Sequence, residues 1–172
     1  MASSFIEYKS NGFWVNDGLV EAFQLLLFKE IQLQYKDRID WLNEYKLELG
    51  MESLPLVTGG MSMKLDEMLT DEQRETIILQ LVDIIRYRIF SDKKYLTGEH
   101  LNALRKIVRE YLLSHKKINW SNEEFENELN NGKYNDDLPI ESYQTGFDLL
   151  RKLINRELKY KPNTPITYWE SH

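Results

Sequence analysis

The segment from residue 17 to residue 35, DGLVEAFQLLLFKEIQLQY, limits the possible folds more than any other part of the chain. Its apolar residues occupy nearly every side of a helix, whereas a surface helix has one apolar stripe and an opposite polar side. We therefore expect a central helix that other helices cover. Asn16 or Asp17 is expected to accept hydrogen bonds from its first amides.

Apolar residues spaced three and four apart predict further helices after this segment. The first is expected at 37–50, with Gly50 as a left-handed stop, and a short helix is expected near 63–69. The next follows a capping-box pattern at 70–73 and continues to Ile89. The remaining helices are expected at 97–114, 121–132 and 140–158. Whether a new helix starts at Asp37 is left open. The architecture expected for residues 1–172 is a single all-α domain, a helical bundle or orthogonal array of about five main helices.

Some finer expectations follow from the same patterns. Ile107 and Ile140 belong to the stripes expected to face the core, and Gly146 is expected where a neighbouring helix approaches closely. Short alternating segments at 4–8 and 165–169 predict one strand near each terminus, which could pair with each other. Residues 160–172, which contain Pro162 and Pro165, are expected to form an extended tail.

Composition excludes several kinds of chemistry. The chain has no cysteine, so disulfides, cysteine nucleophiles and zinc or iron–sulfur sites built on thiolates are excluded. The first residues lack the basic and apolar regions of a signal peptide, and the longest apolar run, LLLF at 25–28, is too short to cross a membrane. We expect a soluble, cytoplasmic protein without membrane contact.

No metal site or cofactor is expected. The chain has three histidines, of which His100 and His115 lie too far apart along one helix to share a metal ion. The pair Gly59–Gly60 lacks the lysine and hydroxyl residue of a phosphate-binding loop. Carboxylate pairs are frequent but lie among polar residues, which is typical of solvated faces.

One pair of residues permits an enzymatic interpretation. Arg109 is followed after five residues by His115, which resembles the arginine–histidine signature of the HEPN superfamily, all-α ribonucleases that act as dimers. The resemblance implies that Arg109 stabilises a phosphoryl transition state and that His115 transfers protons. Glu110 departs from the residue types common after that arginine. The alternative interpretation is that His115 and its basic neighbours complement a helix C-terminus.

The distribution of charge is the most informative functional feature. The net charge is −6, and seven acids and one base between Ser121 and Glu141 account for as much negative charge as the whole chain. Aromatic residues lie among these acids. Acids speed the encounter with a basic protein and buried aromatics hold the complex, so this region is a candidate binding surface, although a solvated helix and loop is the alternative. Its candidate residues are Trp120, Glu123, Glu124, Phe125, Glu126, Glu128, Tyr134, Asp136 and Asp137.

The basic residues are less suggestive. Residues 105–117 carry five bases, which Glu110 interrupts, and nothing in the segment resembles a DNA-recognition helix. Nucleic acid is therefore not the expected partner. The oligomeric state is left open.

The segment NGFWVNDGLVEAFQLLLFKEI, residues 11–31, resembles the N-terminal signature of a group of small bacterial all-helical proteins with a Gly-Phe-Trp start. Small size, acidity and the lack of catalytic motifs suggest by analogy that such proteins are immunity proteins. We expect a protein that neutralises a basic toxin, such as a nuclease, by occluding it. The alternatives are a HEPN-like ribonuclease homodimer that uses Arg109 and His115, and a regulatory interaction module.

The same segment raises a question about its two large aromatics. Phe13 and Trp14 precede the most apolar helix, where large aromatics usually close a core. Phe13 or Val15 is expected to pack on the first turns of that helix. In the alternative, Trp14 stays exposed as a contact residue.

Overall fold

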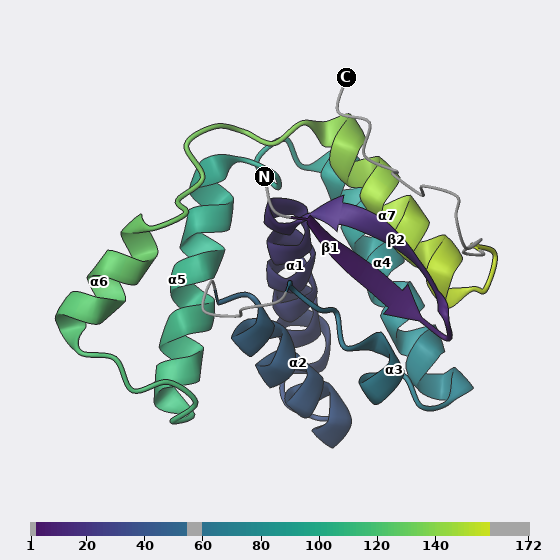
Figure 1. Ribbon diagram of the computed structural model, residues 1–172, viewed down its shortest axis with the longest axis horizontal. Coiled ribbons are helices and arrows are strands. Elements are labelled where there is room, and N and C mark those ends of the chain that lie inside the picture. Colours follow the sequence, from purple (N-terminus) through teal and green to yellow (C-terminus); the bar gives the residue numbers. More distant parts are fainter. Residues whose placement is uncertain (1–2, 55–59, 159–172) are drawn as a thin grey trace.

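Helices make up most of the protein (Figure 1). The computed structural model describes residues 3–54 and 60–158. The mostly helical class expected from the sequence is confirmed, with a short antiparallel sheet at the N-terminus. In chain order the elements are β1 (Ser3–Tyr8), β2 (Asn11–Asn16), α1 (Asp17–Tyr35), α2 (Asp40–Glu52), α3 (Leu65–Met68), α4 (Glu72–Ser91), α5 (Gly98–Ser114), α6 (Asn122–Asn130) and α7 (Ile140–Ile154).

Helix α1 lies at the centre of the described elements, as its apolar residues predict. It contacts both strands and α2, α4, α5 and α7, which surround it in Figure 1. The Asn16 side chain accepts a hydrogen bond from the Leu19 amide at 2.9 Å, so Asn16 is the N-cap. Lys36 and Asp37 both adopt the left-handed conformation, with φ of 43° and 60°, which ends α1 and separates it from α2.

The N-terminal strand expected at 4–8 is confirmed, but its partner is β2. The two strands join through Lys9 and Ser10, which both have positive φ, as a tight two-residue hairpin turn requires. Strand β2 was not predicted, because NGFWVN runs directly into the strong helix signal of α1. The segments at 165–169 and 160–172 lie outside the described residues.

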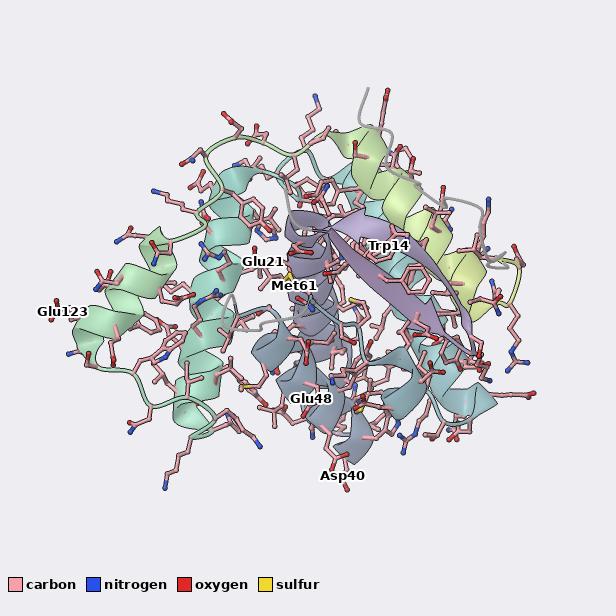
Figure 2. The ribbon with its side chains drawn as sticks, in the orientation of Figure 1. Trp14, Glu21, Asp40, Glu48, Met61 and Glu123 are labelled. Atoms are coloured by element: carbon pink, nitrogen blue, oxygen red, sulfur yellow. The ribbon has the colours of Figure 1, made fainter. Side chains whose placement is uncertain are left out.

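The hairpin answers the question about Phe13 and Trp14. Phe13 and Val15 are buried together with Ile6 on the inner face, so they close the core beside α1. Trp14 lies on the outer face, where it is 43% exposed and packs against Phe5 with 5.2 Å between ring centroids (Figure 2). The alternation of a strand therefore gives the two neighbouring aromatics opposite roles.

Two glycines mark close helix crossings. A Cβ added at Gly146 would lie 2.5 Å from Cζ of Phe23, which confirms the close approach expected there and identifies α1 as the neighbour of α7. Gly50 was expected to end its helix, and this prediction is wrong because α2 continues to Glu52. A Cβ at Gly50 would lie 3.2 Å from Val108, so this glycine lets α2 approach α5.

Several predicted boundaries and faces also need correction. The N-cap of α4 is Asp71, one residue after the predicted Thr70, and it accepts from the Arg74 amide at 2.9 Å. Helix α7 ends at Ile154 instead of residue 158, because Arg156 has φ of 62°. Ile140 is 46% exposed because it lies in the first turn of α7 between exposed neighbours.

Ile107 is 53% exposed because the buried face of α5 includes Arg105 and Arg109, two of the five bases counted in segment 105–117. Both arginines are at most 2% exposed. The basic segment 105–117 is therefore not a continuous basic surface.

A carboxylate on α4 ties the hairpin to the end of α7. Glu75 accepts hydrogen bonds from the Tyr8 hydroxyl, from Lys9 Nζ at 2.8 Å and from Arg156 Nη2 at 3.0 Å. Burial alone would raise the pKa of Glu75, but these three donors together hold it below the ordinary value. The carboxylate therefore stabilises the fold in its ionised form.

Replacement of Glu75 by glutamine is expected to lower the free energy of unfolding at neutral pH by about 1–3 kcal/mol. Because the pKa of Glu75 is lower in the folded state, its contribution is complete above the ordinary glutamate pKa and disappears as the pH falls through the folded pKa. Urea unfolding over a series of pH values checks both statements. Glu44→Gln, an exposed change on α2, is the control. An equal loss for Glu75→Gln at acidic and neutral pH would contradict this account.

Candidate functional site

Helix α6 contains most of the candidate binding residues and lies at the edge of the protein, beside α5 (Figure 1). The predicted capping box is confirmed: the Ser121 hydroxyl accepts from the Glu124 amide and the Glu124 carboxylate accepts from the Ser121 amide. No residue of α6 is fully buried. The helix carries four acids and no base, so it has no opposite charges of its own to pair. Because it also buries no residue, it needs contacts from the rest of the protein to stay folded.

Arg105 of α5 supports the C-terminal end of α6. Its guanidinium donates to the carbonyl oxygens of Leu129 at 3.2 Å and Asn131 at 2.5 Å, and to that of Glu128 at 3.4 Å. The last carbonyls of a helix have no partner within the helix, so a buried arginine from a neighbouring helix acts as a cap. Arg105 thereby fixes the position of α6 on the body.

Glu21 of α1 holds Arg105 from the other side. Its carboxylate accepts from Arg105 Nε at 3.0 Å and lies 3.2 Å from the Tyr134 hydroxyl. Burial raises the pKa of the Glu21 carboxyl, whereas the charges of Arg105 and Arg109 act in the opposite direction. The Glu21–Arg105 pair therefore connects the central helix to residues 120–137, which comprise α6 and the segment that follows it and are called the acidic arm from here on.

Arg109 makes a second connection between α5 and α6. Its Nη2 lies 3.7 Å from Glu128 Oε1, and both side chains are largely withdrawn from solvent. Burial lowers the pKa of Arg109, and the neighbouring charge of Arg105 acts in the same direction. The candidate residue Glu128 is thus occupied by an internal ion pair and is not available to a partner.

Tyr134 is also held internally. Its amide donates to Asn102 Oδ1 at 2.9 Å, its carbonyl accepts from Asn102 Nδ2 at 2.8 Å, and its hydroxyl lies 3.1 Å from the Gly18 carbonyl oxygen. Burial and the charge of Glu21 raise the pKa of the hydroxyl, which stays neutral. Tyr134 therefore anchors the segment after α6 instead of presenting its ring.

The remaining candidate residues divide into supporting and exposed side chains. Asp137 accepts from the Gly98 amide at 3.2 Å, and Glu124 belongs to the capping box. Glu123, Glu126 and Asp136 are exposed and form no ion pair within residues 3–54 and 60–158. Figure 2 shows Glu123 at the outer edge of α6, directed away from the body. These three acids are the available part of the predicted surface.

The two other aromatic candidates are neither fully buried nor fully exposed. Trp120 and Phe125 are half-buried. Trp120 lines a shallow groove of about 210 Å³ together with Glu124, Asn127, Glu128 and Asn131. The two acids of this lining are held internally, Glu124 in the capping box and Glu128 by Arg109, so the groove offers a partner chiefly its aromatic wall.

Arg109 and His115, the residues of the enzymatic alternative, do not converge in this structure. Arg109 is 0% exposed and points toward Glu128. His115 is exposed at the end of α5, where its ring stacks on Tyr111 with 3.9 Å between centroids. Its Nδ1 lies 2.8 Å from the Tyr111 carbonyl oxygen, as expected for a residue that complements a helix C-terminus.

Glu21 and Arg105, which hold the arm, were not among the residues predicted from the sequence. One signal was present: Arg105 and Arg109 follow Leu101 and Leu104 at helical spacing, on the side that also carries Val108 and Leu112. Arginines within an apolar stripe indicate burial with a partner.

In the described part of the chain no group of three or more histidine, aspartate or glutamate residues is placed to hold a metal ion. None of the helices described is both long and apolar enough to cross a membrane. Comparison of the chain with protein-family models, with curated proteins and with solved structures gave no match.

Proposed function

We propose that this chain is a protein-binding protein that covers a basic surface of its partner with the outer face of α6, as an immunity protein neutralises a toxin. The support comes from one observation above all. A peripheral acidic helix without a fully buried residue is held by two buried arginines of the body. A helix that served only as a connection would have no need of such support, whereas a binding surface gains affinity when it is ordered in advance.

The chemistry of the outer face matches a basic partner. Glu123 and Glu126 lie one turn apart on α6 and Asp136 lies on the segment that follows. Their charges attract a basic surface over several ångströms and raise the rate of association. A protein that binds nucleic acid offers such a surface, so a nuclease domain is the toxin class that fits these acids best.

The half-buried aromatics are proposed to supply the contact area. Trp120 and Phe125 are the kinds of residue that carry most of the free energy of binding when a partner covers them. Acids at the rim then set orientation and rate. Neutralisation would follow from occlusion, without a chemical step by this chain.

The experiment is a protection screen. Fragments of the genome that encodes this chain are expressed in bacteria that carry or lack it. We expect at least one fragment that stops growth only in cells without the chain, and we expect the domain it encodes to be basic. The purified pair should form a stable complex in gel filtration.

A screen in which every toxic fragment is equally toxic with and without the chain would contradict the proposal. Cells that carry the Arg105→Ala chain are the internal comparison. Their protection should be weaker, because α6 is no longer held against α5.

A further inference from the structure

The second half of α4 carries an apolar patch outside the acidic arm. Tyr87 and Phe90 are each 72% exposed and lie one helical turn apart. Leu33 of α1 is 49% exposed. Single exposed apolar residues are common on proteins, but neighbouring aromatics with this exposure indicate an interaction site.

A groove lies beside these rings. It has a volume of about 470 Å³ and is lined by Gln34 of α1 and by Asp83, Ile84, Tyr87 and Arg88 of α4. Phe90 follows Tyr87 by three residues, so the ring of Phe90 lies about one turn beyond the groove. The same surface therefore has a projecting aromatic ring and a hollow that can accept one.

We propose that a second copy of this chain docks here, with the two α4 helices antiparallel and the Phe90 ring of each copy in the groove of the other. A two-fold interface requires a surface that is complementary to itself, where residue i meets residue j and j meets i. A ring and a groove on one helix, one turn apart, meet that requirement.

The charges around the patch agree with this arrangement. Asp83, which lines the groove, already pairs within its own chain with Arg86 at 3.0 Å and with Arg151 at 3.1 Å. Arg88, the other charged residue of the lining, pairs with the buried Glu30. A second copy therefore meets no unpaired charge in the lining of the groove.

A membrane surface fits the patch less well. Arg88 pairs with buried Glu30 at 2.7 Å, and Arg86 pairs with Asp148 at 2.5 Å, so the arginines beside the aromatics are neutralised. The net charge of the chain is −6, which opposes approach to anionic lipid. Figure 1 shows α4 and α6 on opposite sides of α1, so a dimer through α4 leaves the acidic arm accessible.

The test is the mass of the protein in solution, measured by light scattering after gel filtration and by sedimentation velocity over a wide range of concentrations. The wild-type chain is expected to show twice the monomer mass at high concentration. Tyr87→Ser with Phe90→Ser is expected to weaken self-association at least about tenfold, as loss of central aromatics does in other interfaces. Because both side chains are exposed, the double variant should keep its thermal unfolding midpoint.

The control is Ile107→Ser with Ile140→Ser, which removes two exposed apolar side chains from α5 and α7. This variant should dimerise like the wild type. A wild-type chain that remains monomeric at every concentration would overturn the proposal, and so would dimers that both variants retain. Flotation with phosphatidylserine vesicles is a third measurement, and wild-type binding that the α4 variant loses, without dimerisation in solution, would replace the second copy by a membrane surface.

Discussion

Replacement of Arg105 by alanine is expected to lower the free energy of unfolding by about 3–5 kcal/mol, the range found when one partner of a buried ion pair is removed. The side chain is 2% exposed and donates to Glu21 and to three carbonyl oxygens at the end of α6. Its loss leaves all four acceptors without this donor. Helix α6 has no buried residue to hold it in place, so its amides should lose protection against hydrogen exchange.

The loss is expected to depend on pH in a defined direction. Burial raises the pKa of Glu21, and the positive charge of Arg105 acts against this rise. Without Arg105 the pKa of Glu21 should therefore rise further. A carboxyl with a higher pKa in the folded state than in the unfolded state binds protons preferentially when folded, and stability falls as the pH rises between the two values. The deficit of Arg105→Ala should therefore be smallest in acid and largest at neutral pH.

Urea unfolding at several pH values, together with hydrogen exchange of the α6 amides, measures both effects. Lys106→Ala is the matched control, because Lys106 is exposed and forms only an exposed pair with Glu110 at 3.9 Å. Its effect should stay within about 0.5 kcal/mol. An Arg105→Ala chain as stable as this control, with α6 still protected, would show that the buried arginine does not hold the arm.

The helices were predictable because their signals are local. The polar cap at Asn16 and the capping box at Ser121 each fix the start of a helix within one stretch of sequence, and both are confirmed. The apolar circumference of α1 likewise predicted its central position. Gly50 was misinterpreted because its role depends on Val108, which lies far away in the sequence.

The candidate site was predictable only in part for the same reason. Sequence located the acidic stretch, but it could not distinguish acids held inside from acids that face outward. Glu128 is occupied by Arg109 and Asp137 by the Gly98 amide, and neither partner is a neighbour in sequence. The same holds for Arg105, whose partners come from α1 and from the end of α6.

Removal of the three available acids is expected to slow association with the basic partner about tenfold at low ionic strength, because these charges steer the encounter. The variant combines Glu123→Gln, Glu126→Gln and Asp136→Asn. None of these side chains forms an ion pair within the described residues, so the fold should be unaffected. Trp120 and Phe125 stay in place, so the dissociation rate should change less than the association rate.

A matched variant distinguishes this surface from the net charge of the chain. Asp40→Asn, Glu44→Gln and Glu48→Gln remove the same number of charges from the exposed side of α2, on which Figure 2 labels Asp40 and Glu48. If net charge alone attracts the partner, both variants should slow association equally. If the outer face of α6 is the binding surface, only the first variant should do so.

The decisive measurement is the association rate of both variants with the partner from the protection screen, recorded by stopped flow at several salt concentrations. We predict that the α6 variant associates slowly with a weak dependence on salt, whereas the α2 variant keeps nearly the wild-type rate and salt dependence. Equal rates for the α6 variant and the wild type at low salt would contradict the assignment of the outer face of α6 as the binding surface.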